Sequence, residues 1–487
     1  MTDPTPRTSP HPSADRQADR LVATLGRTHP VSLTDPNCVV AQKVRDVDAR
    51  MAAVESTGMT IGWPRASVRF VNSPIALHSA TVVLPITAPP IFDGALAVQD
   101  GHIIAVGSRA ELVASYPEAG QSHWEGVLLP GLINAHTHLN YGHTAHLYDN
   151  GKPFPEWIQD MPPIIAATSP QQWRASAEQG IAAMLASGTT AAADVVTGAA
   201  ALSAQYDAGL AGVSYFEVVL ADGPRWAEIR PEFLATLASA PQQGIGISPH
   251  SPYTLDTSVL ADLGNIARDR GIRLHPHGAE QSDEVAFVAD GTGMFADWAT
   301  IGGLGLALLD GGSGRTPIAE LDSVGLLGTD SHIAHGVHAD ASDRTLLRKR
   351  GTAVALCPRS NQRLECGQAP VAAYRAEGNV VGIGTDSLSS SPSLDLLEEV
   401  LAVRALARAQ GTPEDGLDRW LVEALTLGGA TALGRNDIGR LEPGARADLA
   451  VFGVSGPDPY AAIVADGAGR CLATLVAGDL RFGSGIG

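Results

Sequence analysis

The stretch Leu128–Tyr141, LLPGLINAHTHLNY, is an apolar strand that ends in two histidines, His136 and His138. Because side chains on a strand alternate between two faces, this spacing of two places both imidazoles on the same side. Seven later stretches have the same form, an apolar run that stops at a Gly, Pro or polar residue; they are GTTAAADVV (188–196), GVSYFEVVL (212–220), GIGISPH (244–250), GIRLHPH (271–277), DSHIAHG (330–336), GTAVALCP (351–358) and VVGIGTD (380–386).

Helical segments rich in Ala and Leu separate these eight strands. Eight strands that alternate with helices predict parallel pairing, and eight is the number that closes a barrel. We therefore predict an α/β fold with a (β/α)8 TIM barrel over residues 128–434. An open, doubly wound sheet is the alternative. It is disfavoured because no Gly-rich phosphate-binding sequence follows any of the strands.

Short β-rich runs, broken by Gly, Asp and Pro, flank the barrel on both sides. Residues 66–127 include VRFVNSPIALHSATVVLP and GALAVQDGHIIAVG, and residues 435–487 include IGRLEPGARADLAVFG. We predict that these two segments assemble into one small composite β-sandwich domain. Residues 1–65 are predicted to be an N-terminal extension, partly disordered, with short helices at 18–25 and 39–54.

The composition limits the partners and the compartment. The formal net charge of −19 disfavours binding to nucleic acid. No apolar run reaches the ~18 residues that would span a membrane, so we expect no membrane partner. The four cysteines form no CxxC pair, and a cytoplasmic location is the simplest interpretation. We expect a small-molecule substrate, and the sequence leaves a homo-oligomer open.

Polar residues gather at the carboxyl ends of the predicted strands, the face on which barrel enzymes build their active sites. More than half of the 15 histidines lie there, together with two carboxylates; the set is His136, His138, His250, His275, His277, Glu280, His332, His335, His338 and Asp386. Each residue has a simpler explanation by itself. Asp386 could cap a helix and Glu280 could be a solvated first-turn carboxylate. Their joint occurrence in barrel order predicts one site.

Imidazoles and a carboxylate at one barrel mouth are ligands that suit Zn²⁺ or Fe²⁺. We predict one divalent metal, with Zn²⁺ favoured over Fe²⁺. Such a metal lowers the pKa of a water in its open position towards ~7, which makes hydroxide available at neutral pH. A nearby Glu or Asp can then move protons between that water and the leaving group.

Several of these motifs resemble the amidohydrolase superfamily, and within it the branch that deaminates cytosine, guanine and adenosine derivatives. The resemblance rests on PGLINAHTH (130–138), HGAE (277–280), IAHGVH (333–338), CPRSN (357–361), GIGTDS (382–387) and RLEPGARADLAVF (440–452). It extends from about residue 67 to the C-terminus.

The resemblance implies a role for each site residue. Its metal ligands correspond to His136, His138, His277 and Asp386, and its proton shuttle corresponds to Glu280. His335 would orient the water or the substrate, Asp386 would also accept a proton from the attacking water, and His250 would contact the substrate. A binuclear centre bridged by a carboxylated lysine is disfavoured, because none of the three lysines lies on the fourth strand. The deaminases with H-x-E and P-C-x-x-C motifs are excluded, because the Cys pair is absent.

The stretches 134–142, 154–161 and 357–371 resemble aminofutalosine deaminases most, which implies an adenine ring on a nucleoside-like body that carries a benzoate. Arg359 in CPRSN would then be a partner for the carboxylate, since a guanidinium fork suits one. The alternative is that Arg359 is a surface residue at a strand end. Asn140 and Tyr141 follow HTHL and are further candidates for substrate binding, although related proteins have an acidic residue at the position of Asn140.

The predicted function is therefore the metal-dependent hydrolytic deamination of an adenine-like aminated heterocycle, such as an aminofutalosine-like nucleoside derivative. In the reaction that the resemblance implies, metal-activated hydroxide attacks the amidine carbon and ammonia leaves. Two alternatives remain open. One is another reaction at the same mononuclear site, by a triazine-type amino- or chlorohydrolase or a cyclic amide hydrolase. The other is a metal-binding scaffold without catalysis.

Overall fold

The computed structural model describes residues 73–241 and 243–484, all within one compact unit, residues 63–487. The helices predicted at 18–25 and 39–54 lie outside the described residues. So does the start of the first predicted β-segment. In the part of the chain that the structure describes, no helix is both long and apolar enough to cross a membrane.

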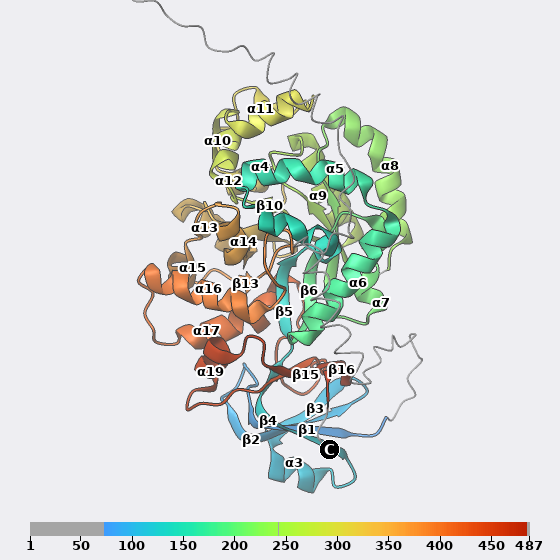
Figure 1. Ribbon diagram of the computed structural model, residues 1–487, viewed down its shortest axis with the longest axis vertical. Coiled ribbons are helices and arrows are strands. Elements are labelled where there is room, and N and C mark those ends of the chain that lie inside the picture. Colours follow the sequence, from blue (N-terminus) through green and yellow to red (C-terminus); the bar gives the residue numbers. More distant parts are fainter. Residues whose placement is uncertain (1–72, 242, 485–487) are drawn as a thin grey trace, which may run out of the picture. The chain divides into compact units, whose positions relative to one another are not determined.

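The predicted barrel is confirmed (Figure 1). Its strands, all paired in parallel, are β5 (Leu132–Thr137), β6 (Thr189–Val196), β7 (Val213–Val218), β8 (Ile245–Pro249), β9 (Arg273–Leu274), β10 (His277–Gly278), β11 (His332–His335), β12 (Ala353–Leu356) and β13 (Val381–Ile383). The predicted fifth strand is divided into β9 and β10 around Pro276, which has no N–H for the ladder. The strand order begins with β10 and ends with β9, so the sheet closes through this one segment.

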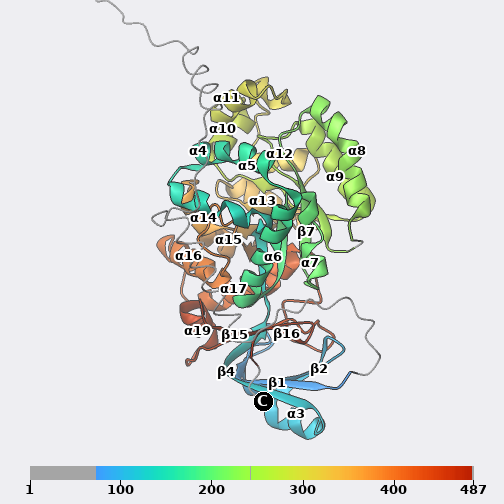
Figure 2. The same cartoon turned by 45° about the vertical axis from the view of Figure 1, so that its right-hand side comes forward.

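Helices follow the barrel strands and cover the outside of the barrel (Figure 2). They are α6 (Pro170–Ala186), α7 (Ala204–Asp207), α8 (Gly223–Ser239), α9 (Thr257–Arg270), α10 (Ser282–Asp290), α11 (Met294–Ile301), α12 (Pro317–Ser323), α13 (Ala341–Arg350), α14 (Pro358–Arg363), α15 (Val371–Glu377), α16 (Leu396–Ala409), α17 (Leu417–Glu423) and α18 (Gly429–Ala432). Local sequence sets their ends. Ser169 and Gln172 form a capping box before α6, and Gly271 ends α9 in the left-handed conformation.

The segment between β5 and α6 is long and folds into four short helices. These are η1 (Leu139–Asn150), α4 (Phe154–Trp157), η2 (Ile158–Asp160) and α5 (Met161–Ala167). Because η1 begins directly after His138, this segment starts at the carboxyl end of β5, beside the predicted metal ligands.

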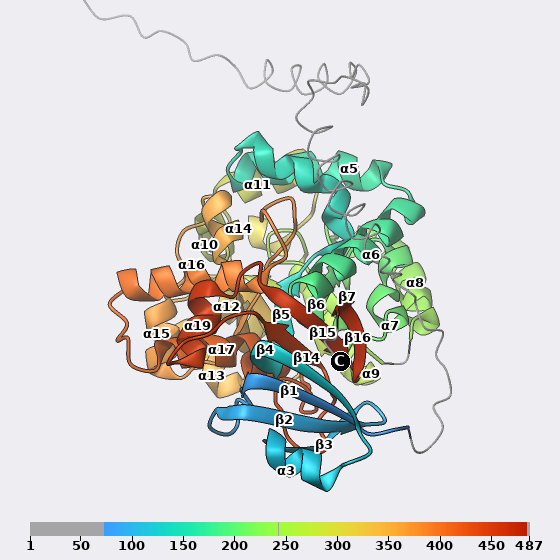
Figure 3. The ribbon, with the colours of Figure 1, turned by 60° about the horizontal axis from the view of Figure 1, so that its bottom comes forward.

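A second sheet combines strands from both flanks of the barrel, as predicted (Figure 3). Its order is β16 (Asp479–Gly483), β15 (Cys471–Val476), β14 (Leu449–Phe452), β4 (Gly120–Pro130), β1 (Ala76–Val83), β2 (Ile91–Gln99) and β3 (His102–Ser108), with α3 (Arg109–Ser115) after β3 and α19 (Pro459–Asp466) between β14 and β15. Strand β4 joins the two flanks, since it pairs with β1 on one side and β14 on the other. The predicted boundary between residues 127 and 128 falls inside β4.

Alternate residues of several barrel strands form one buried cluster, in which alanine predominates and Tyr215 is the largest member. The Tyr215 ring lies 5.1 Å from that of His275 and 5.5 Å from that of His332, measured between centroids. Polar rings therefore share this interior with small apolar side chains, and the His275 ring lies 4.9 Å from that of His136 in β5, measured between centroids.

Candidate active site

Most of the predicted site residues line one cavity at the carboxyl ends of the barrel strands. The cavity is lined by His138, Tyr141, Phe154, Trp157, Ile158, Met161, Pro162, Ile165, Glu217, Val219, Leu220, His250, Tyr253, Thr254, His277, Glu280, Trp298, His335, Leu364, Asp386 and Ser387.

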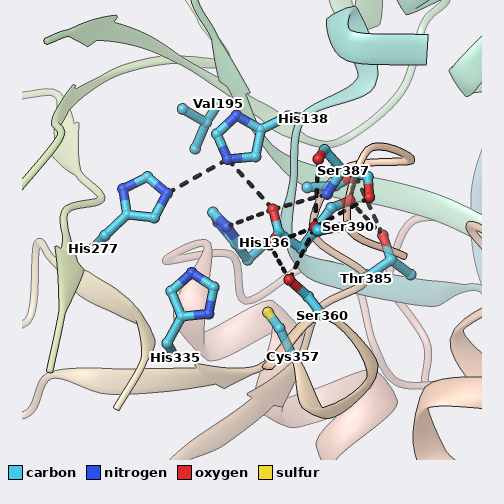
Figure 4. A network of polar contacts seen from close by, with 12 residues as sticks. His136, His138, Val195, His277, His335, Cys357, Ser360, Thr385, Ser387 and Ser390 are labelled. Carbon is cyan, nitrogen blue, oxygen red and sulfur yellow. Dashed lines mark hydrogen bonds and ion pairs between the residues drawn. The ribbon is translucent and has the colours of Figure 1, made fainter. Parts of the chain in front are cut away.

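The four predicted metal ligands lie close together beside this cavity. Ligand atoms of His136, His138 and His277 all lie within 4.8 Å of one another. Asp386 Oδ1 lies 3.5 Å from His136 Nε2 and 3.6 Å from His138 Nε2. Figure 4 shows the rings of His138, His277 and His335 gathered around that of His136.

Hydrogen bonds orient the Nε2 atoms of two of these rings towards the other ligands. A carbonyl only accepts, so His277 Nδ1 donates to His250 O at 3.2 Å, and its Nε2 carries the lone pair, 3.4 Å from His138 Nε2. His136 Nε2 is buried without a hydrogen-bond partner. Burial lowers the pKa of His138 to about 3, so that this ring is neutral. Neutral imidazoles and a carboxylate that converge in this way fit a divalent cation with a preference for nitrogen and oxygen ligands.

Asp386 is held as an ionised carboxylate. Burial alone would raise its pKa, but the imidazoles of His136 and His138 hold it well below the usual range. Its Oδ2 accepts a hydrogen bond from Ser360 Oγ at 2.6 Å, and its Oδ1 accepts one from the Ser387 N–H at 2.8 Å. These contacts fix the orientation of the carboxylate towards the two histidines.

The surroundings of Glu280, unlike those of Asp386, disfavour the ionised form of the carboxyl group. Burial and the nearby charges of Asp386 and Glu284 raise the pKa of its carboxyl well above the usual value. Its Oε1 lies 3.5 Å from His335 Nε2, and the Glu284 carboxylate accepts hydrogen bonds from the backbone N–H groups of Ala279 and Glu280. Glu280 is therefore a buried acid that faces the cavity. Sequence analysis did not identify Glu284, which positions it.

His335 and His250 both line the cavity, as expected for residues that contact substrate. His335 Nδ1 donates to Asn361 Oδ1 at 3.0 Å, which orients its Nε2 towards Glu280. His250 Nδ1 contacts Ser251 Oγ at 2.8 Å, and its ring lies 4.7 Å from that of His277.

The two candidates after HTHL have different environments. Tyr141 lines the cavity, and its hydroxyl lies 2.9 Å from Thr197 Oγ1. The Asn140 side chain, by contrast, is fully buried and serves the backbone. Its amide donates to Val195 O at 3.0 Å and accepts from the Thr197 N–H at 3.1 Å. The structure therefore gives Asn140 a role in holding the end of β6 and does not bring it to the cavity.

Arg359 does not line the cavity either, so its assignment to a substrate carboxylate stays a prediction that this geometry does not favour. Its guanidinium binds Glu399 at 2.6 Å and also contacts Glu398. The Glu399 side chain is 0% exposed, so Arg359 neutralises a carboxylate that is buried within the protein. No local pattern indicates this pairing, because the partners of Arg359 lie some forty residues away on α16.

The Arg359→Ala substitution is expected to lower the free energy of unfolding by about 3–5 kcal/mol, because it leaves a buried carboxylate without its partner. It should change KM equally for neutral and carboxylate-bearing substrates. Denaturant unfolding and steady-state kinetics test both statements. The matched control is Arg408→Ala, whose partner Glu414 is 64% exposed; its loss should leave the free energy of unfolding almost unchanged, because solvent screens an exposed ion pair. A selective increase in KM for the carboxylate substrate would restore the original assignment.

His275, two residues before the predicted ligand His277, orients the ring of His136 through a hydrogen bond. Its Nδ1 donates to His332 O at 3.0 Å, so its Nε2 must accept the hydrogen bond from His136 Nδ1 at 2.8 Å. This chain of donors fixes the tautomer in which His136 Nε2 faces the other ligands. Partners of this kind hold the orientation and raise the basicity of a metal-binding histidine.

The His275→Ala substitution should therefore weaken metal binding by ~10–100-fold. His275→Gln, whose Oε1 can accept the same hydrogen bond, should recover part of that affinity. The measurement is a metal titration against a chelator of known affinity, with circular dichroism as the check on folding. Unchanged affinity in a folded Ala variant would exclude the role assigned to His275.

Backbone strain also marks the site. His335 (φ 71°), Asp386 (φ 58°) and Ala279 (φ 53°), which precedes Glu280, all have left-handed conformations that residues other than glycine rarely adopt. Each costs ~1–3 kcal/mol and persists only where the surroundings enforce it. Such residues cluster at functional sites, and here they turn the chain at the carboxyl ends of three strands.

Two features of the cavity were missed by sequence analysis. Glu217, at the end of β7, is buried; its Oε2 accepts from Thr197 Oγ1 at 2.7 Å, while its Oε1 has no partner among the described residues. Glu217 also lies with His250 and His277 in a group whose ligand atoms are within 4.8 Å of one another. An apolar wall comes mainly from α4, η2 and α5. The apolar residues within the stretch FPEWIQDM (154–161) were the only feature of the sequence that indicated this wall.

Two family profiles match parts of this chain. A profile of the Amidohydrolase family matches residues 127–481, and one of the bacterial imidazolonepropionase-like composite domain matches residues 94–119. A curated 5-methylthioadenosine/S-adenosylhomocysteine deaminase of Haloarcula marismortui is 33% identical over 344 residues, which cover 68% of this chain and 74% of the relative.

Two solved structures have the same fold. A zinc-bound adenosine deaminase from Xanthomonas campestris superposes with a TM-score of 0.71 at 25% identity, covering 84% of this chain and 93% of that one. An aminofutalosine deaminase from Helicobacter pylori has a TM-score of 0.69 at 20% identity, covering 83% and 99%.

Proposed function

The chain belongs to the amidohydrolase family, and we propose that it catalyses the hydrolytic deamination of an adenine-type ring in a nucleoside derivative. One observation carries the proposal. Glu280 and Asp386 line one cavity, and their surroundings push the pKa values of the two carboxyl groups in opposite directions. Such a divergence assigns one group as the acid and the other as the base.

The residues His136, His138, His277 and Asp386 would hold one divalent cation, for which we propose Zn²⁺. When bound, this ion would lower the pKa of a water to ~7 and so supply the nucleophile. The relative from Haloarcula marismortui is named for adenosine derivatives, and the Xanthomonas campestris structure holds zinc. Both names support a zinc-dependent reaction on an adenine ring.

The protein's own groups would then move the protons. Asp386 accepts a proton from the attacking water as the C–O bond to the amidine carbon forms. Glu280, protonated in its buried setting, donates to a ring nitrogen and so makes the neighbouring amidine carbon more electrophilic; addition of the oxygen to that carbon then interrupts the aromaticity of the ring. His335, whose Nδ1–H is held by Asn361, lies beside Glu280, and its Nε2 can accept a hydrogen bond from the incoming hydroxyl group and so orient it. Ammonia leaves with a further proton from these carboxyl groups, and the oxo product remains.

The protonated carboxyl group of Glu280 favours loss of an amine over simple displacement of chloride, because protonation of the ring assists amine departure most. It also argues against a scaffold without catalysis, in which a buried acid facing the cavity would have no purpose. We propose His250 and Tyr141, which line the same cavity, as substrate contacts.

Ammonia release from a panel of substrates tests the proposal. The panel contains adenosine, methylthioadenosine, aminofutalosine, free aminopurines and aminotriazines, and the protein's metal content is measured beforehand. We expect release from one or more adenine nucleosides by protein with about one metal per chain. Release from triazines alone, or from no compound with metal-replete protein, would reject an adenine deaminase.

A further inference from the structure

We propose that the cavity selects an adenine nucleoside whose sugar substituent is uncharged and apolar, and rejects one that carries a carboxylate. This inference rests on the proposed function, because it places the adenine ring at the metal-ligand end of the cavity. The remaining walls must then receive the sugar and its substituent.

Those walls are predominantly apolar. Phe154, Trp157, Ile158, Met161 and Ile165 face the cavity from the segment between β5 and α6. Trp298 of α11 and Leu364, which follows α14, add to the same lining. Aromatic and aliphatic side chains bind a substituent by removing its apolar surface from water, and none of the side chains named here carries a positive charge that could pair with an anion.

No lysine or arginine lines the cavity among the residues that the structure describes. Its acidic lining residues are Glu217, Glu280 and Asp386. A carboxylate that enters this cavity would lose its water without gaining a cationic partner, and burial of an unpaired charge is strongly unfavourable. A neutral substituent escapes that cost.

The cations on neighbouring elements are already engaged. Arg359 binds the buried carboxylate of Glu399. Arg363, at the end of α14, donates to Tyr148 O at 2.7 Å and to Lys152 O at 2.8 Å. The ammonium of Lys152 pairs with Asp160 at 2.6 Å. To recruit any of the three for a substrate carboxylate, the protein would have to break an existing contact.

The test compares three adenine nucleosides that differ only in the group on a 5′-thioether. The first carries a methyl group, the second a short chain that ends in a carboxylate, and the third the same chain with a primary amide. The amide matches the acid in size and shape, so this pair isolates the charge. We expect kcat/KM for the acid to be at least ~100-fold below that for the amide.

Ammonia release from the acid at a rate equal to or above that from the amide would overturn the inference and leave the proposed function standing. Absence of release from all three compounds while adenosine still reacts would overturn the inference alone. Absence of release from these compounds and from every adenine nucleoside of the panel by metal-replete protein would overturn the proposed function, and the inference with it.

A second measurement places a cation in the wall. Ile165→Arg puts a guanidinium on the half-buried wall of α5, and Ile165→Gln is the control of comparable polarity without charge. We expect the acid-to-amide ratio of kcat/KM to rise by ~10-fold in the Arg variant alone. An equal ratio in both variants would argue that charge in this wall does not govern selection.

Discussion

The Glu280→Gln substitution should abolish ammonia release and leave the fold and the bound metal in place. Gln has nearly the same size, so the contacts around the side chain are kept, but it has no carboxyl proton to give to the ring. General acid catalysis contributes ~10²–10⁴-fold to a rate, and we expect a loss of kcat at or above the top of that range, because Glu280 serves both ring protonation and departure of the amine.

The measurement combines kcat, metal content and thermal unfolding on the same preparation. Glu156→Gln is the matched control, since Glu156 is an exposed carboxylate on α4, one of the helices that supply the cavity wall. Its activity should equal that of the original protein. Retained turnover in a metal-replete Glu280→Gln protein would refute the acid role of Glu280.

Loss of a ligand has the second-largest expected effect. His277→Ala removes one of the three imidazoles that converge within 4.8 Å. Since loss of even an outer-shell partner typically costs 10–100-fold in metal affinity, we expect ~100-fold or more here, together with loss of activity. His102→Ala, which changes an exposed histidine of β3, should affect neither property.

Elemental analysis after dialysis, followed by a titration with Zn²⁺, measures this effect. The original protein and His102→Ala should bind about one metal per chain with the same affinity. Unimpaired metal binding by His277→Ala would show that His277 is not a ligand and would contradict the proposed metal site.

The barrel could be predicted from the sequence, because the features that indicate each strand lie within a few neighbouring residues. An apolar run followed directly by His136-x-His138 or by GTDS indicates both a strand and the end at which it carries polar groups. The division of one predicted strand into β9 and β10 followed from Pro276, which is visible in the sequence, although its effect depends on pairing with distant strands.

Side-chain partners across the fold could not be predicted in the same way. Arg359 in CPRSN has the right chemistry for a substrate carboxylate, yet α16 places Glu399 against it. Asn140 follows the predicted metal ligands directly, but its side chain forms hydrogen bonds with the backbone at the end of β6. Both outcomes depend on contacts between residues far apart in the chain, and no local pattern of charge or hydropathy records them.

The most direct test of hydrolytic deamination is the mass of the product formed in water enriched in ¹⁸O. Metal-replete protein should convert an adenine nucleoside to its 6-oxo derivative with one solvent ¹⁸O in the ring substituent, and should release one ammonia for each product. A product without solvent oxygen, or an unchanged adenine ring after prolonged incubation with every nucleoside of the panel, would contradict the account.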